Sequence, residues 1–223
     1  MRKISFSIGE YYHIYNRGAG KSDIFISDSD RKRFMKLLYV CNGTNSVVFK
    51  DIKNINFENI DRGETLVDIG AYCLMKNHFH ILLREKIENG ISIFIQKLLT
   101  AYSKYFNKKN NRTGTLFEGP FKATHVDSDE YLKYLFAYIH LNPVKTIDSN
   151  WKENGITDDK KIERFLMSYP FSSYIDYIGI SREWDKIIDK SSFPEYFSNY
   201  EEFHSFIKEW LKFNTNPAKA SLW

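Results

Sequence analysis

Two apolar stretches joined by a short polar turn make up residues 66–84, and this segment constrains the fold more than any other. Lys76 and Asn77 supply the turn, so the flanking stretches are expected to pair as antiparallel strands near the middle of a sheet. Side chains alternate between the two faces of a strand, so His78 and His80 project to the same side. Two imidazoles held two residues apart on a rigid strand suit a divalent metal ion, although two structural histidines give the same pattern.

Three further elements have clear patterns in the first half of the chain. Residues 11–16 are rich in Tyr and Ile and predict a strand that ends at Arg17. Apolar residues recur with the period of a helix over residues 28–40 and 91–107, and both segments are expected to be amphipathic helices. Residues 42–63 mix polar residues with short apolar pieces, and a strand with a loop insertion is expected there.

A helix is predicted over residues 130–141, with Ser128 or Asp127 as its N-cap and acidic residues in its first turn. The helix is expected to stop at Asn142, because the residue before a proline, here Pro143, avoids helical backbone angles. Beyond residue 145 the character of the sequence changes. The expected elements there are a loop with a short charged helix, an aromatic turn that packs on the core, and one or two appended helices, over residues 146–165, 169–174 and 181–213.

The composition is that of a folded protein with one generous domain, or one domain with an appendage. Of the 223 residues, 43% are hydrophobic and 17% are aromatic, so a large core can form and some rings are available for stacking on bases. Cys41 and Cys73 are the two cysteines, which indicates a reducing compartment rather than a disulfide framework. The chain opens without an apolar signal segment and contains no run long enough to span a membrane, so a cytoplasmic location is expected.

Charge is distributed unevenly along the chain, although the net charge is only +4. Residues 97–125 contain six basic residues and one acidic residue, whereas residues 183–209 contain seven acidic residues and three lysines. A polyanion is therefore expected to meet the basic middle rather than the acidic C-terminal part. An ordinary solvated helix and loop is the structural alternative for the basic segment.

The helix over residues 130–141 is rich in tyrosine. Tyr138 precedes Asn142 by one turn, so a phenol oxygen and an amide oxygen can point into one site. The other two tyrosines, Tyr131 and Tyr134, are interpreted as a packing face.

Four blocks occur in a characteristic order: CLMKNHFHILL, GTLFEGPFKATHV, YLKYLFAYIHLNPVK and YPFSSY, preceded by HIYNRG. With these blocks the chain resembles the single-tyrosine HUH transposases, and especially the REP-associated tyrosine transposases, over roughly residues 10–180. It departs from them in three places. Lys76 stands where the family often has proline, residues 42–63 are longer than usual, and the tail after about residue 180 has no counterpart.

The resemblance implies an α+β fold with an antiparallel sheet of about four to five strands, of the ferredoxin or RRM-like HUH type, and helices on one face. It implies a transposase domain over residues 1–150, and the acidic, helical residues 151–223 are expected to be an extension packed on that domain. The implied enzyme is a metal-dependent endonuclease that cleaves and rejoins single-stranded DNA next to hairpins through a 5′-phosphotyrosine.

The family's functional residues can be carried over by position. The nucleophile corresponds to Tyr138, and the metal ligands for Mg²⁺ or Mn²⁺ correspond to His78, His80 and Asn142. A helix C-cap is the alternative role for Asn142. Candidate DNA contacts are Arg17, Lys104, Arg112, Lys122 and Lys145 for phosphates and Phe117 and Phe121 for base stacking, with core packing as the alternative for both rings. The remaining histidines that stand outside the motif are interpreted as structural or surface residues: His13, His125, His140 and His204.

Two other functions fit the same residues. One is a domesticated protein that binds hairpin DNA or RNA without cutting it, and the other is a replication or mobilisation nickase on the same scaffold. The retention of both histidines and of Tyr138 argues against a pure binding protein, and the LNPVK block and the lack of a helicase region argue against a nickase. The expected protein is a monomer or homodimer associated with the nucleoid of a bacterium or archaeon.

Overall fold

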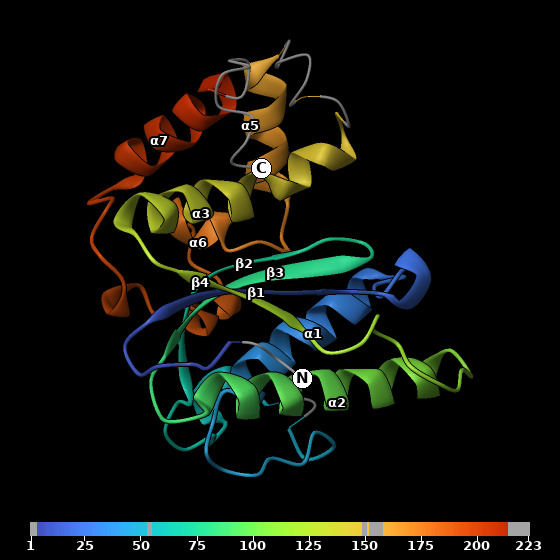
Figure 1. Cartoon of the computed structure of the whole chain (residues 1–223). Coiled ribbons are helices and arrows are strands. Elements are labelled where there is room, and N and C mark those ends of the chain that lie inside the picture. Colours follow the sequence, from blue (N-terminus) through green and yellow to red (C-terminus); the bar gives the residue numbers. More distant parts are fainter. Residues whose placement is uncertain (1–3, 53–54, 149–150, 152–157, 214–223) are drawn as a thin grey trace.

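The computed structural model describes residues 4–52, 55–148, 151 and 158–213 of the 223-residue chain. Its centre is a four-stranded antiparallel sheet with the strand order β2-β3-β1-β4 (Figure 1). The predicted α+β class and the antiparallel sheet are therefore confirmed. The strands are β1 (Tyr11–Arg17), β2 (Val67–Leu74), β3 (His78–Glu85) and β4 (Lys122–Val126).

The hairpin of β2 and β3 forms as the sequence predicts. The main-chain N–H of Met75 donates to the carbonyl of His78 at 2.9 Å and closes the turn. β3 lies in the interior of the sheet, between β2 and β1. The aromatic turn near residue 172 covers the outer edge of β2, because Leu74 donates to the carbonyl of Phe171 at 2.9 Å and Ser173 to that of Tyr72 at 3.0 Å. Such cover removes an exposed strand edge.

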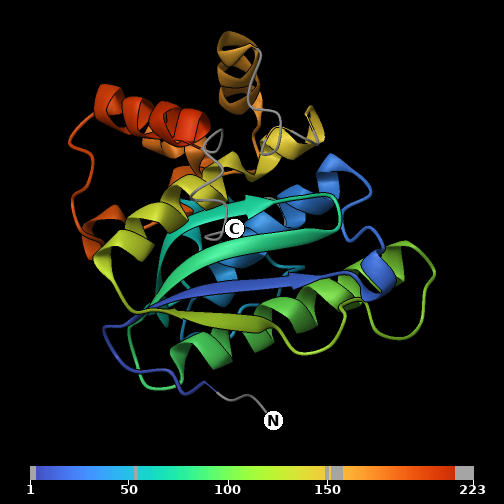
Figure 2. The same cartoon turned by 45° about the horizontal axis from the view of Figure 1, so that its top comes forward.

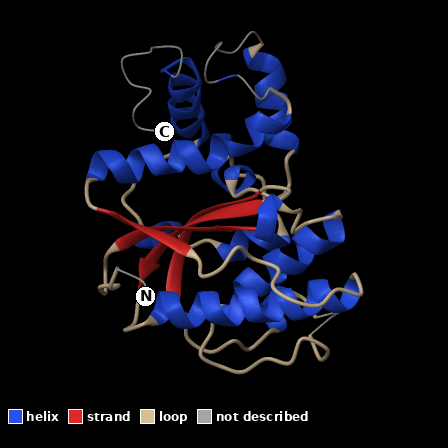
Figure 3. Cartoon of the chain, turned by 45° about the vertical axis from the view of Figure 1, so that its right-hand side comes forward, coloured by secondary structure: helices blue, strands red, loops and turns tan. Residues whose placement is uncertain are grey.

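Helices cover both faces of the sheet, as Figures 1 and 3 show. One face carries α1 (Asp28–Cys41) and α2 (Gly90–Lys109). The opposite face carries α3 (Asp129–Leu141), and α5 (Asp159–Ser168) and α7 (Tyr200–Phe213) lie on the outer side of α3 (Figures 1 and 2). The short helix α6 (Tyr174–Tyr177) lies between α3 and the edge strand β2, where the hydroxyl of Tyr177 donates to the carbonyl of Gly70 at 2.8 Å. The family resemblance implies helices on one face and a helical C-terminal appendage, whereas the structure has helices on both faces. The second layer arises because the sheet carries apolar residues on both faces. Phe79 packs in the cluster with α1 and α2, and Leu82 packs with Ala71 and Cys73 of β2 in the cluster with α3.

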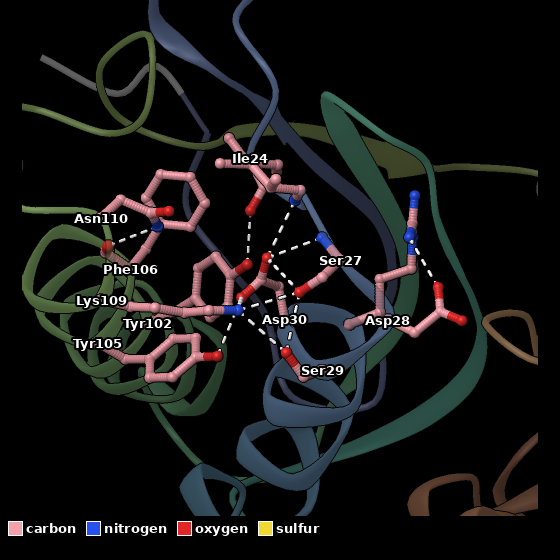
Figure 4. Close-up of polar contacts among 12 residues, drawn as sticks. Ile24, Ser27, Asp28, Ser29, Asp30, Tyr102, Tyr105, Phe106, Lys109 and Asn110 are labelled. Carbon is pink, nitrogen blue, oxygen red and sulfur yellow. Dashed lines mark hydrogen bonds and ion pairs between the residues drawn. The ribbon is translucent and has the colours of Figure 1, made fainter.

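A polar network ties the start of α1 to the end of α2, as Figure 4 shows. Asp30 is fully buried and accepts hydrogen bonds from the main chain of Ser27 at 2.9 Å and from the hydroxyl of Tyr105 at 2.9 Å. Lys109 pairs with the same carboxylate at 2.5 Å. Asp30 and Ser27 also form a capping box that satisfies main-chain N–H groups at the start of α1.

The connection between β1 and α1 forms main-chain hydrogen bonds with the turn that precedes His78. Gly18 donates to the carbonyl of Asn77 at 2.9 Å, and Ile24 and Phe25 donate to the carbonyl of Lys76 at 3.1 and 3.0 Å. Gly18 suits this connection because a Cβ atom there would collide with the main-chain oxygen of Ser22. The network around Asp30 therefore supports a loop that holds the histidine strand in place.

The expected strand within residues 42–63 is wrong for the part that the structure describes, which leaves out residues 53–54. That part consists of loops and one 3₁₀ turn, η2 (Phe57–Asn59). The short apolar pieces anchor the loop instead of forming a strand, since Ile52, Phe57 and Ile60 are buried in the core beside α1.

The end of α3 also differs from the expectation. Ser128 is the N-cap, and its hydroxyl accepts from the N–H of Tyr131 at 3.2 Å, as predicted. Asn142 nevertheless has helical angles, φ −52° and ψ −40°, and the chain continues into the 3₁₀ helix η3 (Asn142–Thr146). Pro143 is tolerated because it stands in the first turn of that helix, where its missing N–H is not needed.

The C-terminal part packs on the outer side of α3. Phe203, Ile207 and Leu211 of α7 are buried in one cluster with Ala137 and Leu141 of α3. The predicted charged helix over residues 146–165 is α5, although residues 149–150 and 152–157 lie outside the described residues. Among the helices of the described residues, none is both long and apolar enough to span a membrane.

Candidate active site

The register of the sheet gathers polar side chains on the face that α3 covers. In the pairing of β1 with β3, Tyr15 lies opposite His80 and Arg17 lies opposite His78. Directly opposite residues of an antiparallel pair share a face, so these four side chains stand on one surface. Tyr15 is also opposite Lys122 of β4, which extends the same polar surface across three strands.

This surface borders a cleft of ≈ 340 Å³. The cleft lies against the histidine pair and the tyrosine of α3, together with residues of β1, of the adjoining loop and of β4. Its lining residues are Tyr15, Asn16, Arg17, Lys21, Asn77, His78, His80, Lys122 and Tyr138. Two of the three predicted metal ligands and the predicted nucleophile therefore border one cleft.

A neighbouring side chain lies within hydrogen-bond distance of the Nδ1 atom of each histidine in the motif. The Nδ1 of His78 is 2.6 Å from the side-chain oxygen of Asn77, and the Nδ1 of His80 is 2.9 Å from the Nε2 of His13. The oxygen of Asn77 accepts from Nδ1 of His78, so Nε2 is the nitrogen that this ring can offer to a metal ion. The contact with His13 occupies Nδ1 of His80, and Nε2 is the other nitrogen of that ring. Burial, together with the positive charges of Lys145 and Arg17, lowers the pKa of His78 to about 4, so this imidazole is neutral at neutral pH.

Tyr138 reaches the site from the last turns of α3. Its ring centroid is 5.2 Å from that of His80 and 5.7 Å from that of His13, with an edge-to-face orientation in both pairs. Burial raises the pKa of the Tyr138 phenol, while a hydrogen bond with the side chain of Asn142 opposes this shift. The hydroxyl is therefore protonated at neutral pH.

Asn142 lies one turn after Tyr138 and is 3% exposed. Its side-chain nitrogen donates to the main-chain carbonyl of Tyr138 at 2.8 Å. This contact satisfies a carbonyl near the end of α3, which is the capping role that the sequence left open. The same contact leaves the amide oxygen of Asn142 as the atom for a ligand role.

Positive charge surrounds the cleft on several sides. Lys122 lines it, and Lys145 lies close enough to His78 to influence its pKa. Arg17 also lines the cleft, and its guanidinium pairs with the carboxylate of Glu118, one of whose oxygens is 2.8 Å away. Lys21, which the sequence reasoning passed over, is a further basic residue of the lining.

Four predicted DNA contacts lie away from this cleft. Lys104 is exposed on α2, on the opposite face of the sheet. Arg112 is exposed in the loop after α2, with its guanidinium 5.6 Å from the centroid of Phe106. Phe117 is only 7% exposed and packs in the core with Phe79. Its burial favours the packing alternative over base stacking, and Phe121, at 9% exposure, belongs to the same core.

The donor set suits a hard or borderline divalent ion. The described residues contain no group of three or more His, Cys, Asp or Glu side chains that could hold a metal ion. The residues that could do so are two imidazoles, His78 and His80, with the amide oxygen of Asn142. Such a mixed nitrogen and oxygen set, open to water and substrate on its remaining positions, fits Mn²⁺ or Mg²⁺.

His13, Tyr15 and Asn77 also belong to the site, although the sequence did not predict them as site residues. His13 was interpreted as structural or surface, yet it is 6% exposed and bonded to His80. The alternation along residues 11–17 placed His13, Tyr15 and Arg17 on one face, but nothing in the sequence showed that this face meets the histidine motif.

An antiparallel sheet with a histidine pair on an interior strand, facing a tyrosine on the helix that crosses the same face, is the arrangement of the single-tyrosine HUH class. The family model described as "Transposase IS200 like" matches residues 11–142, and the chain belongs to this family.

A structural comparison agrees with the family. The chain is similar to a solved structure described as "Structure of the REP associates tyrosine transposase bound to a REP hairpin", with 12% identity and a TM-score of 0.50. The match covers 82% of this chain and 88% of the other. At this identity the similarity concerns the fold. No curated protein sequence matches the chain.

Proposed function

We propose that this protein cleaves and rejoins single-stranded DNA next to hairpins, with Tyr138 as the nucleophile and a divalent ion held by His78 and His80. The observation that carries the proposal is that His78, His80 and Tyr138 of one chain line the same cleft. The IS200-like family and the hairpin-bound structural relative support transposition and hairpin DNA as its setting.

The chemistry follows from the residues. The phenol of Tyr138 gives up its proton and attacks the scissile phosphorus in line. A new bond forms between its oxygen and phosphorus, the bond from phosphorus to the 3′ oxygen breaks, and the leaving oxygen takes up a proton. The products are a 5′-phosphotyrosine and a free 3′-hydroxyl. One phosphodiester replaces another, so the released hydroxyl can reverse the step, which suits strand transfer rather than hydrolysis.

The divalent ion, when bound, supplies positive charge that polarises phosphorus and offsets the charge that develops on oxygen. His78 and His80 would hold it through Nε2, and we propose the amide oxygen of Asn142 as the third ligand. Because a buried phenol is a weak nucleophile at neutral pH, such assistance is needed for Tyr138 to react.

DNA would approach over the basic border of the cleft. We propose Lys122, Lys145 and Lys21 as phosphate contacts, and Arg17 as a fourth, which would exchange its partner Glu118 for a phosphate. Residues 1–150 form the catalytic unit in this proposal. The helices of residues 151–223 would support it by packing on α3.

The test is a covalent adduct on a panel of hairpin oligonucleotides in Mn²⁺. With the wild-type chain, an oligonucleotide labelled at its 3′ end is expected to migrate with the protein on a denaturing gel. The same oligonucleotide labelled at its 5′ end is expected to give a short free fragment. A hairpin-binding protein without cleavage activity would bind the panel and give neither product.

Tyr138→Phe removes one oxygen, so folding and DNA binding should survive while both products disappear. Tyr134→Phe is the matched control, because it makes the same change on the same helix at a ring that packs against Trp210. His78→Ala and His80→Ala should each abolish cleavage and largely keep binding. An adduct that persists in Tyr138→Phe, or label transfer from the 5′-labelled strand, would show that another group attacks.

A further inference from the structure

His13 makes a direct contact with one of the two proposed metal ligands, and the proposed function gives it no role. Its Nε2 lies 2.9 Å from the Nδ1 of His80. Both side chains are only 6% exposed, and their rings are stacked with centroids 5.1 Å apart. A buried pair at this distance is a hydrogen bond, so a single proton lies between the two nitrogen atoms.

Two arrangements of that proton are possible. If Nδ1 of His80 carries it, the Nε2 of His80 keeps a lone pair that can bind a metal ion. If Nε2 of His13 carries it, Nδ1 of His80 is the acceptor and its Nε2 bears a proton in the neutral ring. The first arrangement prepares His80 for metal binding, and the second blocks it.

The tautomer of His78, the other histidine of the motif, indicates which proton arrangement lets both rings present the same nitrogen to a metal ion. Asn77 presents a side-chain oxygen to the Nδ1 of His78 at 2.6 Å. A carbonyl oxygen only accepts hydrogen bonds, so this contact makes Nδ1 of His78 the donor and leaves its Nε2 with a lone pair. His80 presents the same nitrogen only if His13 acts on it as the acceptor.

We propose that His13 is a positioning residue that holds His80 in the Nδ1–H tautomer and in the ring orientation that metal binding needs. This inference rests on the proposed function. His13 is itself held by rings on two sides, since Tyr15 lies 5.0 Å away and Tyr138 lies 5.7 Å away between ring centroids. These two rings fix the direction in which His13 meets His80, and one of them belongs to the proposed nucleophile, Tyr138.

The first experiment determines the tautomers of His13 and His80 in the metal-free wild-type protein. Two-dimensional ¹H–¹⁵N NMR of histidine rings separates protonated from unprotonated nitrogen, and the His13→Gln and His80→Ala variants assign the signals. The proposal expects a proton on Nδ1 of His80 and none on Nε2 of His13. A proton on Nε2 of His13 with a bare Nδ1 on His80 overturns it.

The second experiment measures Mn²⁺ binding by electron paramagnetic resonance in the absence of DNA. His13→Leu removes the acceptor and is expected to weaken binding by about 10–100-fold, the usual effect of losing such a supporting hydrogen bond. His13→Gln places an amide oxygen near the position of Nε2, so it should bind at least about tenfold more tightly than His13→Leu. His125→Leu is the control, because His125 pairs with Glu10 on the opposite face and should not change binding.

The outcomes separate this inference from the proposed function. A wild-type chain that binds no Mn²⁺ refutes the proposed function, and the role of His13 with it. A wild-type chain that binds Mn²⁺, together with a folded His13→Leu variant that binds it equally well, refutes only the role of His13. If His13→Leu does not fold, the tautomers of the wild-type protein and the His13→Gln variant decide the matter.

Discussion

The carboxylate of Asp30 offers a strong test of how the scaffold supports the site, and we expect Asp30→Ala to destabilise the fold markedly. The side chain is fully buried and forms one half of the capping box at the start of α1. It also joins α1 to α2 through Tyr105 and Lys109 (Figure 4). The loss therefore affects two helices that pack under the histidine strand.

The magnitude can be built from the contacts. Losing the cap costs about 1 kcal/mol. The Tyr105 hydroxyl and the main-chain N–H of Ile26, which also donates to Asp30 at 3.0 Å, lose their acceptor, which costs about 1–2 kcal/mol more. The pair with Lys109, whose side chain is 36% exposed, adds at most about 1 kcal/mol. The sum of about 3 kcal/mol corresponds to a fall in Tm of roughly 6–12 °C for a protein of this size.

Thermal unfolding followed by circular dichroism measures this difference. Asp28→Ala is the matched control, because Asp28 stands in the same turn but is 73% exposed, and its removal should change stability by less than about 0.5 kcal/mol.

Burial raises the pKa of Asp30, but hydrogen bonds from Lys109, Ser27 and Tyr105 outweigh it, and the net shift of the pKa is downward. The charge-dependent stability is therefore present near neutral pH and is lost as pH falls through the lowered pKa. Equal stability of Asp30→Ala and Asp28→Ala at pH 7 would refute this reasoning.

Two further predictions concern the site. A mixture of His80→Ala and Tyr138→Phe chains should form no adduct, because one chain supplies both rings at a centroid distance of 5.2 Å, and restored cleavage would reveal a site shared between chains. Binding of hairpin DNA should weaken with salt. Lys122→Gln and Lys145→Gln should each flatten the slope of log affinity against log salt by about one unit or less, whereas Lys104→Gln should leave it nearly unchanged, because Lys104 lies on the opposite face. A larger effect of Lys104→Gln would place the DNA on the α2 side.

Local sequence patterns predicted the elements that carry the candidate site. The polar turn at Lys76 and Asn77 between apolar stretches gave the hairpin and put His78 and His80 on one face. The cap at Ser128 and the helical period gave the helix that carries Tyr138. These signals are local because turn chemistry, capping and side-chain periodicity depend on residues only a few positions apart.

Tertiary structure decided what surrounds those residues. The pairing of β1 with β3 sets Tyr15 opposite His80, and it brings His13 against the same ring, although 67 positions separate His13 from His80. The packing of α3 on the histidine face decided that Tyr138 meets the motif, while α2 carries Lys104 to the other side. The burial of Phe117 in the core is likewise a result of tertiary packing. Strand register and the choice of face depend on burying apolar surface between segments far apart in the chain, and no local pattern of residues encodes that choice.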